Sequence, residues 1–187
     1  MNVYDFDKTI YRNDSTADFF MYCLRKHPKI IVTTPKMFFA FVNFYILKKG
    51  SKTEFKEKLY KFLKYIDVET EVEIFWDKNI CKIKDFYKQT QKDDDVIISA
   101  SPEFIIKPIC KRLNIKYAMA SRVDKYTGRY DGINCYGEEK VRRFYEVFPD
   151  KRIDEFYSDS YSDTPLAKLA KRAYLVKGDK LFEWDKF

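Results

Sequence analysis

Two carboxylates stand close together at the start of the chain. Asp5 and Asp7 flank Phe6 at the end of a short strand predicted for residues 2–6. A pair at this spacing can supply a nucleophile and a proton donor, or oxygen ligands for a metal ion. The same Asp-x-Asp triplet is also typical of a turn or a helix cap. The segment alone therefore leaves a catalytic and a structural interpretation open.

Two serines follow a second apolar run. Ser99 comes directly after Val96–Ile98, and Ser101 precedes Pro102, where a helix is predicted to begin. If Ser101 caps that helix, the free N–H groups and the positive end of the helix dipole face the site and attract an anion. An ordinary helix cap without a ligand is the alternative interpretation of Ser101.

A second acidic pair lies in a serine-rich loop. Asp159 and Asp163 are four residues apart within Ser158–Asp163, directly after a predicted strand. Carboxylate oxygens and water are the ligands that Mg²⁺ prefers in proteins. The loop is therefore a candidate metal site, and a solvated acidic loop is the alternative. Lys140 supplies a positive charge near the start of the preceding predicted helix.

These polar residues follow the strands of a predicted α/β fold. The predicted strands span residues 2–6, 96–98, 116–120, 153–157 and 173–176, the helices 102–113, 138–147 and 164–172, and a hairpin 123–134 with its turn near Thr127-Gly128. Strands that alternate with helices form a mostly parallel sheet covered on both faces. Ligands bind outside the carboxyl ends of such strands, so we expect the candidate residues to meet at one edge of the sheet.

Residues 16–90 are predicted to be a helical insertion after the first strand, which leaves 1–15 and 91–187 as the core domain. The expected boundary signals are Ser15 as an N-cap, Thr34-Pro35 as a helix start, Lys48-Lys49-Gly50 as a helix end, the capping box Ser51–Glu54 for a helix to about residue 65, and Asp67 as the cap of a helix to about residue 88.

The composition excludes several kinds of site. The chain has 187 residues, 45% of them hydrophobic, which is enough for one domain with a buried core and a small insertion. His27 is the only histidine, so no two-histidine metal site and no Ser-His-Asp triad is expected. Four cysteines without a Cys-x-x-Cys pair indicate reduced thiols and a cytoplasmic protein.

The charge and the apolar segments limit the partners. Basic residues outnumber acidic ones by 36 to 29, and residues 16–90 hold 15 against 9. A positive field favours a phosphate ester, an acidic lipid surface or nucleic acid, and solvated lysines are the alternative interpretation. Asp5 and Asp7 stand where a signal peptide needs basic and apolar residues. Met37–Leu47 is too short to span a bilayer. We therefore expect no leader and no membrane span.

Taken in order, the motifs resemble those of a known superfamily. An Asp-x-Asp-x-Thr segment, a serine after a strand, a lysine and an Asp-x-x-x-Asp segment are similar to the four motifs of the haloacid dehalogenase superfamily. Ile98–Glu103, Gly137–Lys140 and Tyr157–Ser160 resemble its phosphoserine-phosphatase-like branch. The resemblance covers nearly the whole chain. It implies an α/β fold with a Rossmann-like, mostly parallel sheet and a small helical cap inserted after the first strand.

The resemblance also implies a Mg²⁺-dependent phosphatase that acts through an aspartyl phosphate. Asp5 is then the nucleophile, and Asp7 the acid that protonates the leaving oxygen. Mg²⁺ is expected on Asp5, the Asp7 carbonyl and Asp159, with Asp163 in support. The residues expected to hold the phosphoryl group or to orient the first loop are Ser99, Ala100, Ser101, Lys140 and Thr9.

Three other interpretations compete with a phosphatase. A receiver domain also uses Asp, Mg²⁺ and Lys, but it carries its phosphorylated Asp on a later strand and lacks the helical insertion. A nucleic-acid-binding module suits the basic, aromatic residues 16–90, yet these aromatics recur at helical spacing, which is typical of a core. A non-catalytic member of the family is disfavoured because all four motifs are complete.

The predicted cap disfavours phosphoserine as the substrate. Phosphoserine phosphatases use a cap arginine for the substrate carboxylate and an acidic residue for its amine. Residues 54–66 contain no arginine, and Lys61 or Lys64 would be a poor replacement. Asp14 lies near the position of the amine-binding acid but is short. The aromatic residues of this segment are Phe55, Tyr60, Phe62 and Tyr65. They suit a small organic or lipid-like phosphate monoester, or else they only pack the cap.

Overall fold

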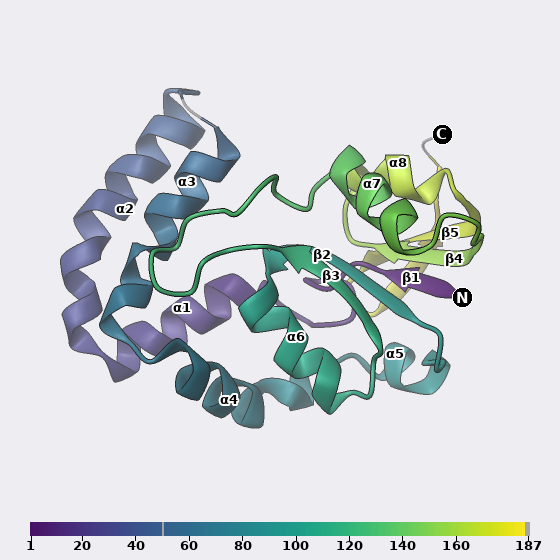
Figure 1. Cartoon of the computed structure of the whole chain (residues 1–187), viewed down its shortest axis with the longest axis horizontal. Coiled ribbons are helices and arrows are strands. Elements are labelled where there is room, and N and C mark those ends of the chain that lie inside the picture. Colours follow the sequence, from purple (N-terminus) through teal and green to yellow (C-terminus); the bar gives the residue numbers. More distant parts are fainter. Residues whose placement is uncertain (50, 186–187) are drawn as a thin grey trace.

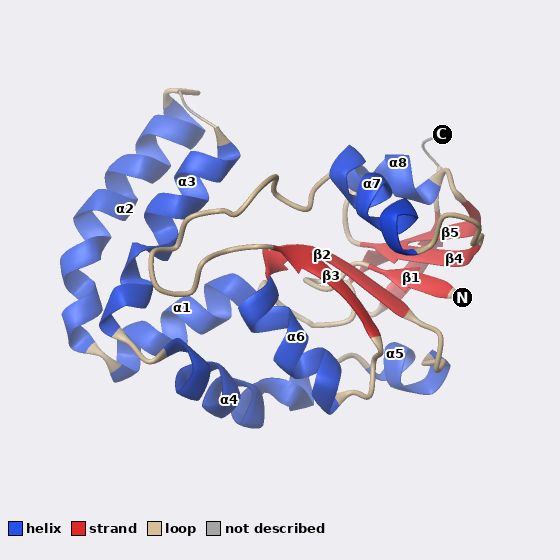
Figure 2. Ribbon diagram, viewed as in Figure 1, coloured by secondary structure: helices blue, strands red, loops and turns tan. Residues whose placement is uncertain are grey.

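A six-stranded sheet forms the centre of the computed structural model, which describes residues 1–49 and 51–185 (Figures 1 and 2). The strand order is β3-β2-β1-β4-β5-β6. The strands are β1 Asn2–Tyr4, β2 Val96–Pro102, β3 Tyr117–Ser121, β4 Ile153–Ser158, β5 Ala170–Lys177 and β6 Lys180–Glu183. Only the β5–β6 pairing is antiparallel among the described strands. The predicted α/β fold with a mostly parallel sheet is confirmed.

Strand β1 lies in the middle of the sheet, with β2 and β4 on either side. Val3 pairs with Val96 on one side and with Phe156 on the other, and all three are fully buried. Apolar runs of this kind are typical of strands covered on both faces. The chain that leaves β1 therefore emerges between the carboxyl ends of two neighbouring strands, where α/β sheets bind ligands.

Helices cover both faces of the sheet. Tyr4 and Ile97 point into a core shared with α5 and α6, whereas Val3 and Ile98 point into a core shared with α7 and α8. Successive strand residues face opposite sides, so one short apolar run fills both layers. The helices concerned are α5 Asp85–Thr90, α6 Glu103–Arg112, α7 Glu138–Val147 and α8 Thr164–Ala167.

Between β1 and β2, the described residues form helices and connecting loops and contain no strand. In chain order, the helical segments before α5 are α1 Ser15–Lys26, a 3₁₀ segment Pro28–Thr33, α2 Thr34–Phe41, a π-helical turn Val42–Ile46, α3 Lys52–Leu59, a 3₁₀ segment Tyr60–Tyr65, α4 Val68–Asn79 and a 3₁₀ turn Ile80–Lys82. Helices α2 and α3 lie at the opposite end of the molecule from β5, and α4 packs against α6 (Figure 1). The division into a cap of 16–90 and a core stays a prediction.

Three of the predicted helix starts are correct. Ser51 and Glu54 form a capping box, each side chain accepting the other's backbone N–H at 3.1 Å. Asp67 precedes α4, and Thr34-Pro35 begin α2. The end predicted for that second helix is wrong, because the α-helical part stops at Phe41 and continues as a π-helical turn. The predicted terminal glycine lies outside the described residues.

The first helix has a different cap from the one predicted. Asp14 is the N-cap of α1, and its Oδ1 accepts the N–H of Ala17 at 2.9 Å. Ser15 is the first helical residue, and its own N–H donates to Asp7. Asp and Ser are both common N-cap residues. The hydrogen bond from the N–H of Ser15 to Asp7 favours Asp14 as the cap and Ser15 as the first helical residue.

The fourth helix is shorter than predicted. Helix α4 ends at Asn79 rather than near residue 88. Ile83 then forms a β-bridge with Tyr11, and the N–H of Lys84 donates to the carbonyl of Ile10 at 2.8 Å. The chain thus returns beside the point where it left β1, which a continuous helix would prevent. Helix α5 follows as a separate element.

The C-terminal part also differs from the prediction. Helix α8 ends at Ala167, because β5 begins at Ala170 and pairs with β4 along its length. Gly178, in the left-handed region with φ 60°, forms a tight turn into β6, which the sequence analysis missed. The hairpin predicted for residues 123–134 contains one bridge, Val123 to Tyr130, and no described strand.

Candidate active site

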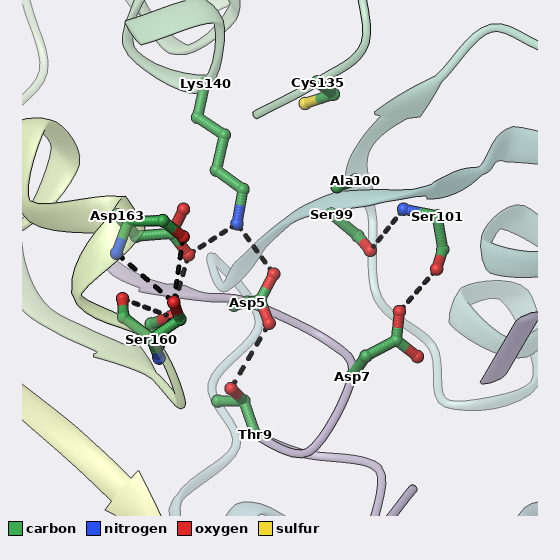
Figure 3. A network of polar contacts seen from close by, with 12 residues as sticks. Asp5, Asp7, Thr9, Ser99, Ala100, Ser101, Cys135, Lys140, Ser160 and Asp163 are labelled. Carbon is green, nitrogen blue, oxygen red and sulfur yellow. Dashed lines mark hydrogen bonds and ion pairs between the residues drawn. The ribbon is translucent and has the colours of Figure 1, made fainter. Parts of the chain in front are cut away.

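Three buried charged side chains meet at the carboxyl end of β1 (Figure 3). Lys140, in the first turn of α7, donates a hydrogen bond of 2.7 Å to Oδ1 of Asp5 and one of 2.7 Å to Oδ2 of Asp163. The three side chains are 2%, 10% and 3% exposed, respectively. The hydroxyl of Thr9 lies 3.4 Å from Oδ2 of Asp5. Residues from three separate parts of the sequence are thereby brought together.

Burial and charge act in opposite directions on this cluster. Burial raises the pKa of Asp5, and the nearby Lys140 works against that shift. Burial lowers the pKa of Lys140, but Asp5 and Asp163 together raise it above its ordinary value. The ammonium group therefore stays charged and balances one of two carboxylates. With both carboxylates ionised, the cluster keeps one negative charge in excess.

Asp7 is held by two hydrogen-bond donors. The N–H of Ser15 donates to Oδ1 at 2.6 Å, and the hydroxyl of Ser101 donates to Oδ2. The hydroxyl of Thr16 lies 3.1 Å from that of Ser101. Burial, followed by the charge of Asp14, raises the pKa of Asp7. A carboxyl group with a raised pKa is suited to proton transfer near neutral pH.

The two serines of β2 have roles that differ from the predicted helix cap. The N-cap of α6 is Pro102, and no side chain caps that helix. The pairing of β2 with β3 shifts between Ile98 and Pro102, so the strand continues through both serines. Ser99 is buried, and its Oγ accepts the N–H of Ser101 at 3.1 Å. Ala100 and Ser101 line the cavity that also contains Asp5. Ser99 does not line it and instead supports Ser101 through this hydrogen bond.

The loop after β4 contributes the second pair of carboxylates. Asp159 lines the cavity, and burial raises its pKa while Lys8 opposes the shift. In Asp163, Oδ2 also accepts the hydroxyl of Ser158 at 2.8 Å. Its Oδ1 is buried without a hydrogen-bond partner. A buried acceptor of this kind calls for a cation or a water molecule, which fits the predicted metal site. Ser158 is a site residue that the sequence analysis did not assign.

The charges around the cavity also fit a divalent cation. Among residues 1–49 and 51–185, no three carboxylate, imidazole or thiol side chains are grouped so that they could hold a metal ion. The predicted Mg²⁺ site needs fewer, because it combines two carboxylates with one backbone carbonyl and water. The cavity is lined by the aspartates Asp5, Asp7, Asp14, Asp159 and Asp163 and by the lysines Lys8, Lys56 and Lys140. The five aspartates outnumber the three lysines, so a bound cation would offset the remaining negative charge and allow a phosphate to enter.

The cavity has a volume of about 640 Å³ and lies between the end of the sheet and helices α1–α3. Its polar side is formed by the site described above. Its other side is apolar and consists of Phe20, Met21, Met37, Phe38, Phe41, Phe55 and Leu59. A space of this size and character is typical of a site for a small organic molecule.

Among the described side chains of the helical insertion, that of Lys56 reaches the site. Lys56 of α3 lines the cavity, and its ammonium group donates to the carbonyl of Ala100 at 3.0 Å. The sequence analysis considered Lys61 and Lys64 instead, which are exposed and do not line the cavity. Helical spacing could have indicated Lys56, because it lies three residues before Leu59 and therefore shares a face of α3 with it.

The aromatic residues of residues 54–66 divide into two groups. Phe55 and Tyr60 line the cavity. Phe62 is buried beneath it, with its ring 5.1 Å from that of Phe20. Phe55 and Tyr60 therefore face the cavity, and their contact with a substrate stays a prediction, whereas Phe62 packs the interior of the helical insertion.

Comparison with known proteins shows which family the sequence matches. The profile of haloacid dehalogenase-like hydrolases matches residues 3–168. A probable phosphatase of Mycobacterium tuberculosis is 34% identical over 94 residues, which cover 46% of this chain and 33% of that protein. The matched segments cover 33–48% of the length of the curated relatives.

Two solved structures share the fold. A protein of unknown function from Bordetella pertussis Tohama I superposes with a TM-score of 0.75 at 18% identity, over 92% of this chain and 87% of that one. A phosphoserine phosphohydrolase-like protein from Francisella tularensis subsp. tularensis SCHU S4 gives 0.57 at 19% identity, over 92% and 86%. Because the profile covers most of the chain, the chain belongs to the haloacid dehalogenase-like hydrolase family.

Proposed function

We propose that this chain is a Mg²⁺-dependent phosphatase that hydrolyses a phosphate monoester through an aspartyl phosphate on Asp5. The observation that carries the proposal is the position of Asp5, whose carboxylate lies at the switch point of the sheet and is bound by Lys140 at 2.7 Å. Asp7 stands two residues further on with a separate hydrogen-bond environment. Two carboxylates with different surroundings are suited to different roles.

The reaction proceeds in two displacements. An oxygen of Asp5 attacks phosphorus, the ester P–O bond breaks, and Asp7 gives its proton to the leaving oxygen. Asp7 then takes a proton from a water molecule, whose oxygen attacks the phosphorus of the aspartyl phosphate. This step releases inorganic phosphate and restores Asp5. Lys140 offsets the charge on the phosphoryl oxygens, and Ser99, Ala100 and Ser101 at the adjoining end of β2 help to hold the phosphoryl group.

Mg²⁺ fits the residues at this site. Asp5, the Asp7 carbonyl and Asp159 would hold the ion, and Asp163 would support it with its unpaired buried oxygen. When bound, the ion supplies the positive charge that lets a phosphate dianion approach several carboxylates. Thr9 keeps the first loop in place through its contact with Asp5.

The helical insertion acts as a cap that selects the substrate. We place the cap at residues 16–90 and the core at 1–15 and 91–187. Lys56 joins the cap to Ala100 of the core at 3.0 Å, and the rest of the cap wall is mainly apolar. The substrate is therefore a monoester with an apolar organic group rather than phosphoserine. Asp14, at the cavity wall, caps α1.

The enzyme is proposed to act in the cytoplasm on a small molecule, without nucleic acid. Cys23, Cys81, Cys110 and Cys135 are all free thiols, as expected in a reducing compartment. The second candidate function is that of a non-catalytic phosphate-binding protein, which would make the same contacts to phosphate without hydrolysing the ester.

The test is phosphate release from a panel of aryl, alkyl and amino-acid phosphates, with Mg²⁺ and with a chelator. We expect Mg²⁺-dependent release that the Asp5→Asn variant loses, since an amide cannot form the aspartyl phosphate. Asp93→Asn, which alters an exposed carboxylate outside the cavity, serves as the matched control. Phosphate binding without turnover by the wild-type protein would establish the non-catalytic alternative instead.

A further inference from the structure

One long segment of the helical insertion carries basic charge and no acidic residue. Between Phe19 and Thr53 the sequence contains no Asp or Glu. The same segment contains seven basic residues: Arg25, Lys26, Lys29, Lys36, Lys48, Lys49 and Lys52. The formal charge of this segment equals the net charge of the whole chain, +7. A charge of one sign gathered on one part of a protein attracts a surface of the opposite sign.

The same segment exposes a group of large apolar side chains, which we call the cap-tip surface. Its residues are Ile31, Val32, Phe38, Phe39, Ile46 and Leu47, and each is 51–66% exposed. They lie on α2 and on the turns before and after it, at the end of the molecule far from β5 (Figure 1). Single exposed apolar residues are ordinary, but six of them within residues 31–47 indicate a contact surface.

The dimensions of this segment exclude a transmembrane role and favour an interfacial one. Thr34–Ile46 form 13 helical residues, about 20 Å at 1.5 Å per residue, against about 30 Å for a bilayer core. Among the described residues, no helix is long and apolar enough to cross a membrane. A short helix with exposed aromatic and aliphatic side chains and flanking lysines is typical of a segment that lies in the lipid headgroup region.

The cap-tip surface is continuous with the proposed active site. Phe38 is exposed at the tip and also lines the catalytic cavity, beside Met37 and Phe41. The same cavity contains Asp5 at its polar end. An apolar path therefore leads from the reacting carboxylate to the outer surface of the insertion.

We propose that the cap-tip surface docks on an anionic lipid bilayer and that the substrate is a lipid phosphate drawn from it. The lysines contact anionic headgroups, and the apolar side chains enter the boundary with the acyl chains. The phosphate then reaches Asp5 while the acyl chains follow the apolar wall around Phe38. The docking part stands on its own, whereas the substrate part rests on the proposed function.

Docking is tested by flotation of the wild-type protein with vesicles. Vesicles of phosphatidylcholine mixed with phosphatidylglycerol should bind it roughly tenfold or more tightly than pure phosphatidylcholine, and added salt should weaken binding. The double variant Val32→Ser/Phe39→Ser should lose most of this binding. The control Ile133→Ser/Phe182→Ser changes two exposed apolar side chains outside the helical insertion and should keep it. Lys29→Glu/Lys49→Glu should bind weakly, and its control Lys151→Glu/Lys168→Glu normally.

The second experiment measures the rate of phosphate release by the same variants. With nitrophenyl phosphate in solution, Val32→Ser/Phe39→Ser should match the wild type, and with phosphatidic acid in anionic vesicles it should be roughly tenfold or more slower. Asp5→Asn should bind vesicles normally. If the wild type hydrolyses the soluble ester but does not bind vesicles, docking is wrong and the proposed function stands. If vesicles bind but neither ester is hydrolysed, the proposed function fails and docking stands.

Two further outcomes would also overturn the docking site. Equal vesicle binding by wild type and Val32→Ser/Phe39→Ser would show that lysines alone attract anions without the apolar surface. A wild-type dimer that becomes a monomer in this variant, with no vesicle binding, would assign the surface to a second copy of the chain.

Discussion

The N–H of Ser15 donates a hydrogen bond of 2.6 Å to the carboxylate of Asp7. Ser15 is the first residue of α1, and Asp7 is the proposed general acid. The first turn of the helix that leads into the insertion is thereby joined directly to the proposed proton donor. Ser101 of β2 holds the other oxygen of the same carboxylate. Asp7 is thus positioned by the start of α1 and by the end of β2 at once.

Asp7→Asn should affect alkyl and aryl esters differently. An alkoxide needs a proton to leave, so we expect hydrolysis of an alkyl phosphate to fall by roughly 10²- to 10⁴-fold. Nitrophenolate leaves without a proton, so the first step on nitrophenyl phosphate should lose much less. Hydrolysis of the aspartyl phosphate should stay slow and produce a burst of nitrophenol in stopped-flow absorbance. Equal losses on both esters, with no burst, would make Asp7 a structural residue.

Asp159→Ala should weaken Mg²⁺ binding without unfolding the protein. Even the loss of a group that only supports a metal ligand costs roughly 10- to 100-fold in affinity, so we expect at least roughly a tenfold rise in the Mg²⁺ concentration for half-maximal activity. Titration calorimetry with Mg²⁺ gives a readout independent of turnover. Asp150→Ala, at an exposed carboxylate, is the control. Unchanged Mg²⁺ affinity in Asp159→Ala would remove it from the metal site.

Glu71 should stabilise the helical insertion in a pH-dependent way. Its buried carboxylate accepts hydrogen bonds from Tyr22 at 2.8 Å and Lys26 at 2.9 Å, joining α4 to α1. Burial alone would raise its pKa, but Lys26, Tyr22 and His27 outweigh burial and lower the pKa. A carboxyl group with a depressed folded pKa contributes stability above its unfolded pKa, about 4.3, and loses it as pH falls through the folded value.

The test is the free energy of unfolding of Glu71→Gln in urea at several pH values. We expect a loss of about 1–2 kcal/mol at pH 7, which shrinks as the pH falls below about 4.3. Glu183→Gln, at an exposed position, should match the wild type. A difference that stays constant down to pH 3 would attribute the loss to packing rather than to charge.

Phosphoserine should be a poorer substrate than a carboxylate-free ester of similar or larger size. No arginine is among the described residues that line the cavity. A desolvated carboxylate without a charged partner costs about 1–3 kcal/mol, or roughly tenfold to hundredfold in kcat/KM. Leu59→Arg, which places a guanidinium at the cavity wall, should raise kcat/KM for phosphoserine specifically. Lys61→Arg, outside the cavity, should not. A wild-type preference for phosphoserine by tenfold or more would mean that Lys56 or another cation binds the carboxylate.

Local signals predicted the elements of the fold well where the sequence alone determines them. The capping box of Ser51 and Glu54, the apolar run before Ser99 and the helix around Lys140 depend on neighbouring residues, and all three are confirmed. The ends predicted for α6 and α7 are close to those observed, whereas the ends of α4 and α8, which depend on distant contacts, were wrong. Helix α4 stops because the chain must pair Ile83 with Tyr11, a contact that no local pattern reveals.

The candidate site shows the same division. The order of the motifs sufficed to select Asp5, Lys140 and Asp163, which the structure joins by two hydrogen bonds of 2.7 Å. Spacing could not show that Ser101 bonds to Asp7 instead of capping α6, because both arrangements suit a serine before a proline. Nor could it place Lys56 at Ala100, since that contact crosses from the insertion to the core.

The most direct test of the account is to find where the phosphoryl group goes. Asp7→Asn, mixed with nitrophenyl phosphate and Mg²⁺ and quenched in acid, should accumulate a phosphate adduct, and peptide mass spectrometry should place it on Asp5. The adduct should be absent when Mg²⁺ is chelated and absent in Asp5→Asn/Asp7→Asn. Phosphate release without any adduct on Asp5, or an adduct on Asp159 or Asp163 instead, would contradict the central claim.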